Sequence, residues 1–152
     1  MYERILLPTD GSEEMDAVID HAADLAGDHG GTIHALYVVD TATMGRMPVD
    51  SSWDSLAEML REDGERALDA VADRVGDVPL ERDLREGAPS RAIVEHAEES
   101  DADAIVMGTH GRGGLDRLLL GSVAERVVRT APVPVIVVPV RNAIEETIDR
   151  VE

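Results

Sequence analysis

The glycine-rich segment that follows Met107 holds the residues whose spacing points most clearly to chemistry. Gly108 is followed after two residues by Gly111, and after nine more by the pair Gly121-Ser122. Glycines let backbone amides approach an anion closely, and a helix that begins near Ser122 offers free N–H groups and the positive end of its dipole. The spacing therefore predicts a cradle for a polyphosphate, in which Ser122 contacts phosphate, caps the helix, or does both. The simpler interpretation of such a loop is that it only turns a corner.

Asp10 is the second candidate, because it follows an apolar segment in the turn Pro8-Thr9-Asp10-Gly11-Ser12. Its carboxylate has two interpretations: a ligand for a nucleoside or metal ion, or a turn residue, since Asp-Gly is a common turn pair. The glycine loop expected opposite to it favours the ligand role. Ser12 is predicted to cap the helix that follows.

Other polar residues are weaker candidates. His110, in the glycine loop, is a candidate general base or phosphate contact, although surface hydrogen bonding is the commoner role of a loop histidine. Asp40 can meet a ribose hydroxyl, as acids do in dinucleotide folds, but a turn carboxylate is the favoured interpretation. The remaining histidines lie on different predicted elements without a metal-binding spacing such as HxxxH, and we expect them to be structural or exposed: His21, His29, His34 and His96.

Missing residue types exclude several kinds of chemistry. All 14 basic residues are arginine, so the chain has no Walker-A lysine and no lysine for a Schiff base. It has no cysteine either, which excludes disulfides, thiol nucleophiles and cysteine-ligated zinc. Its only aromatic residues are Tyr2, Tyr37 and Trp53, too few for a platform on which nucleic-acid bases stack.

The formal charge of −18 over 152 residues has two consequences. It opposes binding to nucleic-acid backbones and anionic lipids over most of the surface, so we expect neither as a partner. Such acidity without lysine is also typical of proteins adapted to multimolar salt, where the Debye length falls to about 3 Å and carboxylates cease to repel. Arg112, Arg117 and Arg126 are the cations nearest to the glycine loop.

Hydrophobic periodicity predicts the elements that must position these residues. Apolar segments predict strands at 4–7, 32–39, 104–107 and 135–138, and alternating apolar and charged residues predict an edge strand at 80–85. Helices are predicted at 12–29, 52–75, from the turn 87–90 to about 100, and at 122–130, with Gly30-Gly31 stopping the first. Asp40 to Asp50 is predicted to be a loop.

Strands that alternate with helices indicate one α/β domain with a parallel, Rossmann-like sheet and helices on both faces. Ligands of such sheets bind at the carboxyl ends of the strands, where the strand order reverses, so Asp10 and the glycine loop are expected to line one crevice. The longest apolar run, Ala131 to Val140, is too short to span a membrane. No cleavable signal pattern is visible, so a soluble cytoplasmic protein is expected.

Several segments are similar to the universal stress protein family, in the order that family has them. They are ILLPTDGS, LYVVD, GAPSRAIVEHAEE, DAIVMGTHGRGG and APVPVIVVP, and the spacing of Gly108, Gly111 and Gly121-Ser122 resembles the family's ATP-binding motif. The resemblance implies a domain at 1–140 with five parallel strands in the order 3-2-1-4-5. Residues 141–152 form an acidic tail outside it.

The same resemblance implies a site for ATP, with Mg²⁺ or Mn²⁺ as an accompanying ion. Asp10 would lie at the nucleoside or the metal, and Thr9 and Val39 would line the adenine pocket through backbone and aliphatic contacts. The other implied binding residues are Pro8, Met107, Gly108, His110, Gly111, Arg112, Gly121, Ser122 and Val123. AMP or another adenosine ligand is the alternative to ATP.

The last predicted strand, Val135–Val138, is apolar and expected at the sheet edge, where an uncovered strand invites pairing. The resemblance implies that two copies pair there as a homodimer. We rank three functions: a nucleotide-binding stress or signalling module with little or no catalysis, then a nucleotide-free interaction protein, then a slow ATPase or phosphotransferase. No complete catalytic constellation is visible for the last of these.

Overall fold

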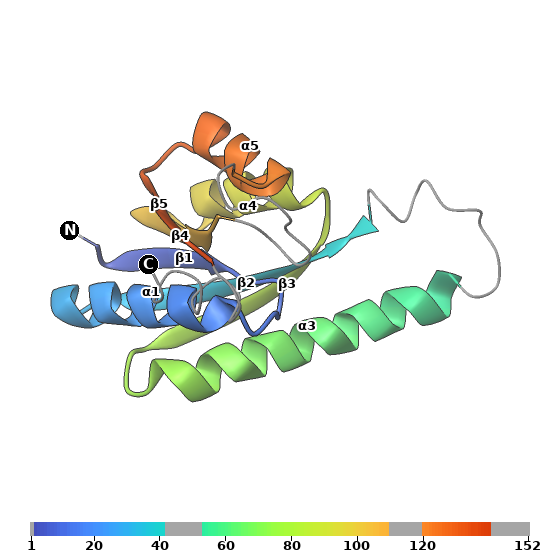
Figure 1. Cartoon of the computed structure of the whole chain (residues 1–152), viewed down its shortest axis with the longest axis horizontal. Helices are drawn as coiled ribbons and strands as arrows, with labels where there is room; N and C mark the ends of the chain where they lie inside the picture. Colours follow the sequence, from blue (N-terminus) through green and yellow to red (C-terminus); the bar gives the residue numbers. More distant parts are fainter. Residues whose placement is uncertain (1, 42–52, 110–119, 141–152) are drawn as a thin grey trace, which may run out of the picture.

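The strands form one five-stranded parallel sheet (Figure 1). The structure is a computed structural model that describes residues 2–41, 53–109 and 120–140. The strands are β1 (Arg4–Pro8), β2 (Thr32–Asp40), β3 (Leu80–Gly87), β4 (Ala104–Gly108) and β5 (Val135–Val138). Their order is β3-β2-β1-β4-β5, which confirms the predicted order 3-2-1-4-5 and the edge position of the strand at 80–85.

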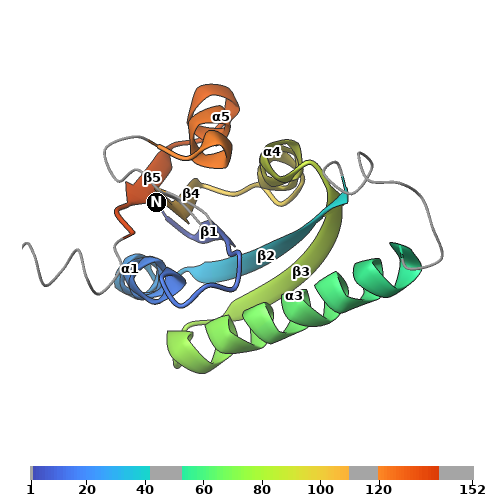
Figure 2. The same cartoon turned by 45° about the vertical axis from the view of Figure 1, so that its right-hand side comes forward.

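Two pairs of helices cover the two faces of the sheet (Figures 1 and 2). The helices of one face are α1 (Met15–His29) and α3 (Trp53–Val75), and those of the other are α4 (Pro89–Glu99) and α5 (Ser122–Thr130). None of the helices in the described part of the chain is both long enough and apolar enough to cross a bilayer.

The central strands are buried on both sides, as expected for a parallel sheet between two helical layers. Ile5, Leu6 and Leu7 of β1 are all fully buried. Because successive side chains of a strand point to opposite faces, Ile5 and Leu7 pack in the core beneath α1 and α3, whereas Leu6 packs beneath α4 and α5. The continuous apolar runs in the sequence therefore correspond to strands that supply both cores.

Glycine ends α1 where the sequence predicts it. Gly30 has a φ of +63°, a left-handed conformation that glycine adopts without steric cost, and the Gly31 N–H donates to the Ala26 carbonyl over 2.8 Å. The chain then enters β2 at Thr32, whose N–H donates to the Glu3 carbonyl. The end of α1 at Gly30 thus fixes the residue at which β2 begins to pair with β1. It thereby fixes which residues of β2 lie at the carboxyl end of the sheet.

Candidate functional site

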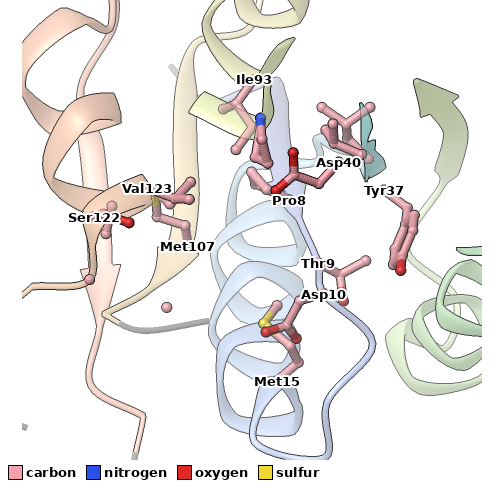
Figure 3. Close-up of a pocket in the computed structure, with 16 residues that line it drawn as sticks. Pro8, Thr9, Asp10, Met15, Tyr37, Asp40, Ile93, Met107, Ser122 and Val123 are labelled. Atoms are coloured by element: carbon pink, nitrogen blue, oxygen red, sulfur yellow. The ribbon is translucent and has the colours of Figure 1, made fainter. Parts of the chain in front are cut away.

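A cavity of about 530 Å³ lies at the carboxyl ends of β1, β2 and β4 (Figure 3). This is the end of a parallel sheet at which α/β proteins bind ligands, next to the reversal of strand order between β1 and β4. The residues that line it are Pro8, Thr9, Asp10, Met15, Leu36, Tyr37, Val38, Asp40, Pro89, Ile93, Met107, Gly108, Gly121, Ser122, Val123 and Ala124.

Hydrogen bonds hold the turn after β1 against the cavity. The Thr9 N–H donates to the Leu36 carbonyl over 2.9 Å, and the Thr9 hydroxyl accepts from the Gly11 N–H over 3.1 Å. Asp10 Oδ1 accepts from the Ser12 N–H over 2.9 Å. Asp10 is therefore the turn residue that one interpretation predicted, and it lines the cavity at the same time.

The predicted helix cap at Ser12 is wrong. α1 begins at Met15, whose N–H donates to the Ser12 carbonyl, and Glu14 occupies the N-cap position without a side-chain cap. The Asp10 carboxylate takes the Ser12 N–H, so Asp10 and Ser12 form a turn that precedes the helix.

Four residues of β2 line the cavity, and Tyr37 is one of them. Val38 and Asp40 line the cavity, as does Leu36. Val39, in contrast, is 1% exposed and packs in the core beneath α1 and α3. The side chain of Val39 is thus not among the described lining residues, and its contact with adenine stays a prediction.

The predicted phosphate side of the cavity is built where β4 ends and α5 begins. The Gly121 N–H donates to the Thr109 carbonyl over 2.7 Å, and this bond brings Gly108 and Gly121 to neighbouring positions in the cavity wall. Gly121 is the N-cap of α5, without a side-chain cap, so Ser122 is the first helical residue and does not cap the helix. The first turn of α5 lines the cavity through Ser122, Val123 and Ala124, and helix N-termini favour anions.

Three predicted site residues, His110, Gly111 and Arg112, lie outside the described residues, as does the cation Arg117. None of the described lining residues is basic, whereas two of them, Asp10 and Asp40, are acidic. An anion at the described wall would therefore have only backbone N–H groups as donors, and the two carboxylates suit hydroxyl groups or a metal ion.

Three residues that line the cavity had no predicted binding role or only a minor one. Asp40, which we interpreted as a turn residue, is the last residue of β2 and lines the cavity. Pro89 and Ile93 of α4 also line it, although no binding role was predicted for them. The sheet topology could have indicated them, because the helix that follows β3 begins at the carboxyl end of the sheet, beside the end of β2.

Two of the histidines that we expected to be structural or exposed contact each other. Nε2 of His34 and Nε2 of His96 lie 2.9 Å apart, and His96 is 3% exposed. The two residues are on β2 and α4, which are distant in the sequence, so no local sequence spacing predicts their contact.

Comparisons with known proteins place the chain in a family. The model of the universal stress protein family matches residues 1–139. The universal stress protein MJ0531 of Methanocaldococcus jannaschii is 43% identical over 141 residues, which cover 91% of this chain and 82% of that protein.

Two solved structures resemble the whole sheet and its helices. The structure of MJ0577 from the same organism has a TM-score of 0.83 at 30% identity, and the match covers 94% of this chain and 99% of that one. A universal stress protein solved in complex with cAMP has a TM-score of 0.71 at 25% identity, with 92% and 99% of the two chains covered. By sequence and by structure, this chain belongs to the universal stress protein family.

Proposed function

We propose that this protein is an adenine-nucleotide-binding stress or signalling module, with ATP as its ligand. The observation that carries the proposal is the meeting of Gly108, Gly121 and the start of α5 in one cavity with Asp10 and Asp40. Its volume of about 530 Å³ falls within the usual range for small-molecule sites, roughly 300–1,000 Å³. The related structure that contains cAMP supports an adenine nucleotide as the class of ligand.

In this proposal the cavity divides into an apolar half and a polar half. Adenine lies against the apolar wall, whose side chains include those of Leu36 and Val38. The ribose hydroxyls meet the carboxylates, and the phosphates meet the backbone amides around Gly108 and Gly121. His110, Gly111 and Arg112 complete the phosphate contacts from the segment outside the described residues.

A divalent ion accompanies the nucleotide in this proposal. Mg²⁺ and Mn²⁺ bind oxygen ligands, and the described wall offers the carboxylate oxygens of Asp10 and Asp40. Asp10 would hold the ion, which would neutralise charge between the phosphates and this acidic wall. The donor set therefore fits the ion that the sequence resemblance implies.

Binding rather than catalysis is the proposed role. Phosphoryl transfer depends on positioned groups and on cations that stabilise developing charge. The described lining residues contain no histidine, lysine or arginine, so His110 and Arg112 are the candidates that a slow ATPase or phosphotransferase would need. A nucleotide-responsive module in the cytoplasm, with few turnovers, is the function that this wall supports best.

We include a homodimer in the proposal. β5 is the edge strand next to β4, and all four of its residues, Val135–Val138, are only half-buried. An apolar edge that pairs antiparallel with the same strand of a second copy would lose its open hydrogen-bonding groups. Light scattering in concentrated KCl should give the mass of two chains, and a monomeric mass contradicts this part of the proposal.

The test of nucleotide binding starts from protein purified in concentrated KCl. The protein is denatured, any released nucleotide is identified by mass, and the emptied and refolded protein is titrated with ATP, AMP and cAMP. Gly121→Val should weaken ATP binding at least tenfold, because the added side chain stands where phosphate must approach the backbone. Gly27→Ala is the control, since a Cβ at Gly27 in α1 meets nothing within 4 Å. Unchanged ATP affinity in Gly121→Val contradicts the phosphate assignment.

Turnover separates binding from catalysis. Release of phosphate from γ-labelled ATP should stay near background in the wild-type protein. Turnover that is clearly above background, and that His110→Ala abolishes, favours the ATPase alternative.

A further inference from the structure

Three titratable side chains from three elements lie close together on the face of the sheet that α4 covers. They are His34 of β2, Asp83 of β3 and His96 of α4, and one ligand atom from each lies within 4.8 Å of the others. The strand register explains the meeting. His34 pairs with Glu81 and Leu36 with Asp83, so these four side chains share one face of the sheet. α4 packs over that face and adds His96.

The two imidazole rings contact each other, and each also faces a carboxylate. Their Nε2 atoms lie 2.9 Å apart, and the ring planes are nearly perpendicular, at 84°. His34 Nδ1 lies 3.5 Å from Glu81 Oε2, and His96 Nδ1 lies 3.8 Å from Asp83 Oδ2. Within the described residues, the buried Nδ1 atom of His96 has no hydrogen-bond partner.

Two neutral imidazoles cannot satisfy all three of these contacts. Each neutral ring carries one N–H, so the pair has two protons, whereas the ring–ring contact and the two ring–carboxylate contacts each require one. In either arrangement of tautomers that keeps the ring–ring hydrogen bond, one imidazole lone pair faces a carboxylate. A third proton removes this conflict, and so does a metal ion that takes the Nε2 lone pair of each ring, because both rings then carry their proton on Nδ1 and no lone pair faces a carboxylate.

The surroundings favour a metal ion. Burial lowers the pKa of His96, and the neighbouring His34 and Arg85 lower it further, although Asp83 and Glu99 act in the opposite direction. The two Nε2 atoms already face each other over 2.9 Å, so one ion can bind both rings. Carboxylates that face the second nitrogen of an imidazole, as Glu81 faces His34, commonly orient metal-binding histidines.

Arg85 is a competing cation for the cluster. Its Nε lies 3.7 Å from Asp83 Oδ2, but its Nη2 lies only 2.5 Å from Glu99 Oε2. Because Glu99 holds the guanidinium more closely, Asp83 can turn to a metal ion while Arg85 keeps a partner. The Asp83 side chain is 40% exposed, which gives an ion a route from solvent.

The geometry points to a binding site for one divalent transition-metal ion of the Zn²⁺ class, ligated by His34, His96 and Asp83. Imidazole nitrogens and a carboxylate oxygen are zinc ligands, and three protein ligands leave a fourth position for water. Zinc–nitrogen bonds of about 2.0–2.1 Å in a tetrahedron hold two nitrogens about 3.3 Å apart, so the two Nε2 atoms need to separate by only a few tenths of an ångström. The site shares no residue with the nucleotide cavity and does not depend on its proposed ligand.

Zinc titration of the metal-stripped full chain tests this site. The experiment uses calorimetry in 1 M KCl, which screens nonspecific binding to surface carboxylates. The wild type should bind one Zn²⁺ per chain, and Co²⁺ in its place should give the intense visible absorption of a four-coordinate ion. His34→Gln and Asp83→Asn should each weaken zinc binding at least 100-fold, and Glu81→Gln by about 10–100-fold.

His21→Gln is the matched control, because His21 is an exposed histidine on α1 and its loss should leave zinc binding unchanged. His96→Gln is checked for folding by circular dichroism, since His96 is buried. His34 and Asp83 are partly exposed, so their variants keep the test decisive even if His96→Gln does not fold. A wild type that binds no zinc, or equal zinc affinity in the wild type, His34→Gln and Asp83→Asn, overturns the proposal.

Discussion

The two helical layers of this protein differ in both charge and content. Helices α1 and α3 carry eleven carboxylates against three arginines, whereas α4 and α5 carry four carboxylates against three arginines. The core beneath α1 and α3 is apolar, while the layer of α4 and α5 contains the His34–His96 pair and part of the cavity wall. One layer thus carries most of the helical negative charge, and the other carries the polar chemistry.

This separation is relevant to the proposed nucleotide site of so acidic a chain. A formal charge of −18 suggests repulsion of any nucleotide. However, the α5 N-terminus lies in the layer whose helices are nearly balanced in charge, on the opposite face of the sheet from α1 and α3. Position within the fold, rather than total charge, sets the local field at the cavity.

The strongest test of this division compares two leucines that are equally buried in opposite layers. Leu36 is 0% exposed and Leu68 is 1% exposed. Each change to alanine should cost about 2–5 kcal/mol of unfolding free energy, because each leaves a cavity in a packed core. Urea unfolding of the wild type and both variants, at one and the same KCl concentration, measures this cost.

Nucleotide titration of the same two variants separates the layers. Leu36→Ala should also weaken ATP binding, since Leu36 lines the cavity, whereas Leu68→Ala should not. If both variants lose ATP affinity equally, the proposed division of roles between the layers is wrong.

A smaller effect on the unfolding free energy is expected from the row of aspartates on α1. Asp16, Asp20, Asp24 and Asp28 follow one another at four-residue spacing, where like charges repel by about 0.2–0.5 kcal/mol per pair. The double variant Asp24→Asn, Asp28→Asn removes two such pairs. It should therefore raise the unfolding free energy in dilute buffer by roughly 0.5–1 kcal/mol.

Salt should erase that gain, because the Debye length falls to about 3 Å at 1 M. Unfolding of the wild type and the double variant is compared across a KCl series, in which the wild type should gain stability as salt rises. Glu95→Gln is the control in the other layer, since Glu95 lies 4.0 Å from Arg91 and its loss should not stabilise. A wild type as stable in dilute buffer as in concentrated KCl contradicts the prediction of salt adaptation.

The smallest expected effect is a pH dependence that links α1 to α3. The Arg74 guanidinium hydrogen-bonds Asp20 and lowers the pKa of its carboxyl in the folded protein. Asp20 therefore contributes stability above its unfolded pKa of about 3.9, and this contribution is lost as pH falls through the lower folded value. Because the Asp20 side chain is 52% exposed, the contribution should be only a few tenths of a kcal/mol.

Acid titration of stability measures this link. Asp20→Asn should flatten the fall in unfolding free energy between pH 5 and 2 slightly. Asp24→Asn serves as the comparison on the same helix. If the two variants have identical acid profiles, the Asp20–Arg74 pair contributes nothing measurable.

Most of the fold could be predicted because its signals are local. Continuous apolar runs such as Ile5–Leu7 identify buried strands, and Gly30-Gly31 identifies the end of α1 at His29. The order of the strands followed from the family resemblance and is confirmed. The predicted cap at Ser12 failed because α1 begins only at Met15, after a turn in which Asp10 accepts the Ser12 N–H and the Ser12 carbonyl accepts the Met15 N–H.

The sequence by itself determined the elements, the parallel sheet and the end of it at which the cavity lies, because strand runs, helix periodicity and glycine stops act over a few residues. Only the tertiary structure decided that Val38 rather than Val39 faces the cavity, and that acidic and nearly balanced helices lie on opposite faces. It also decided that His34 meets His96 across 62 residues. Such contacts depend on sheet register and helix packing, which join segments that no local pattern relates.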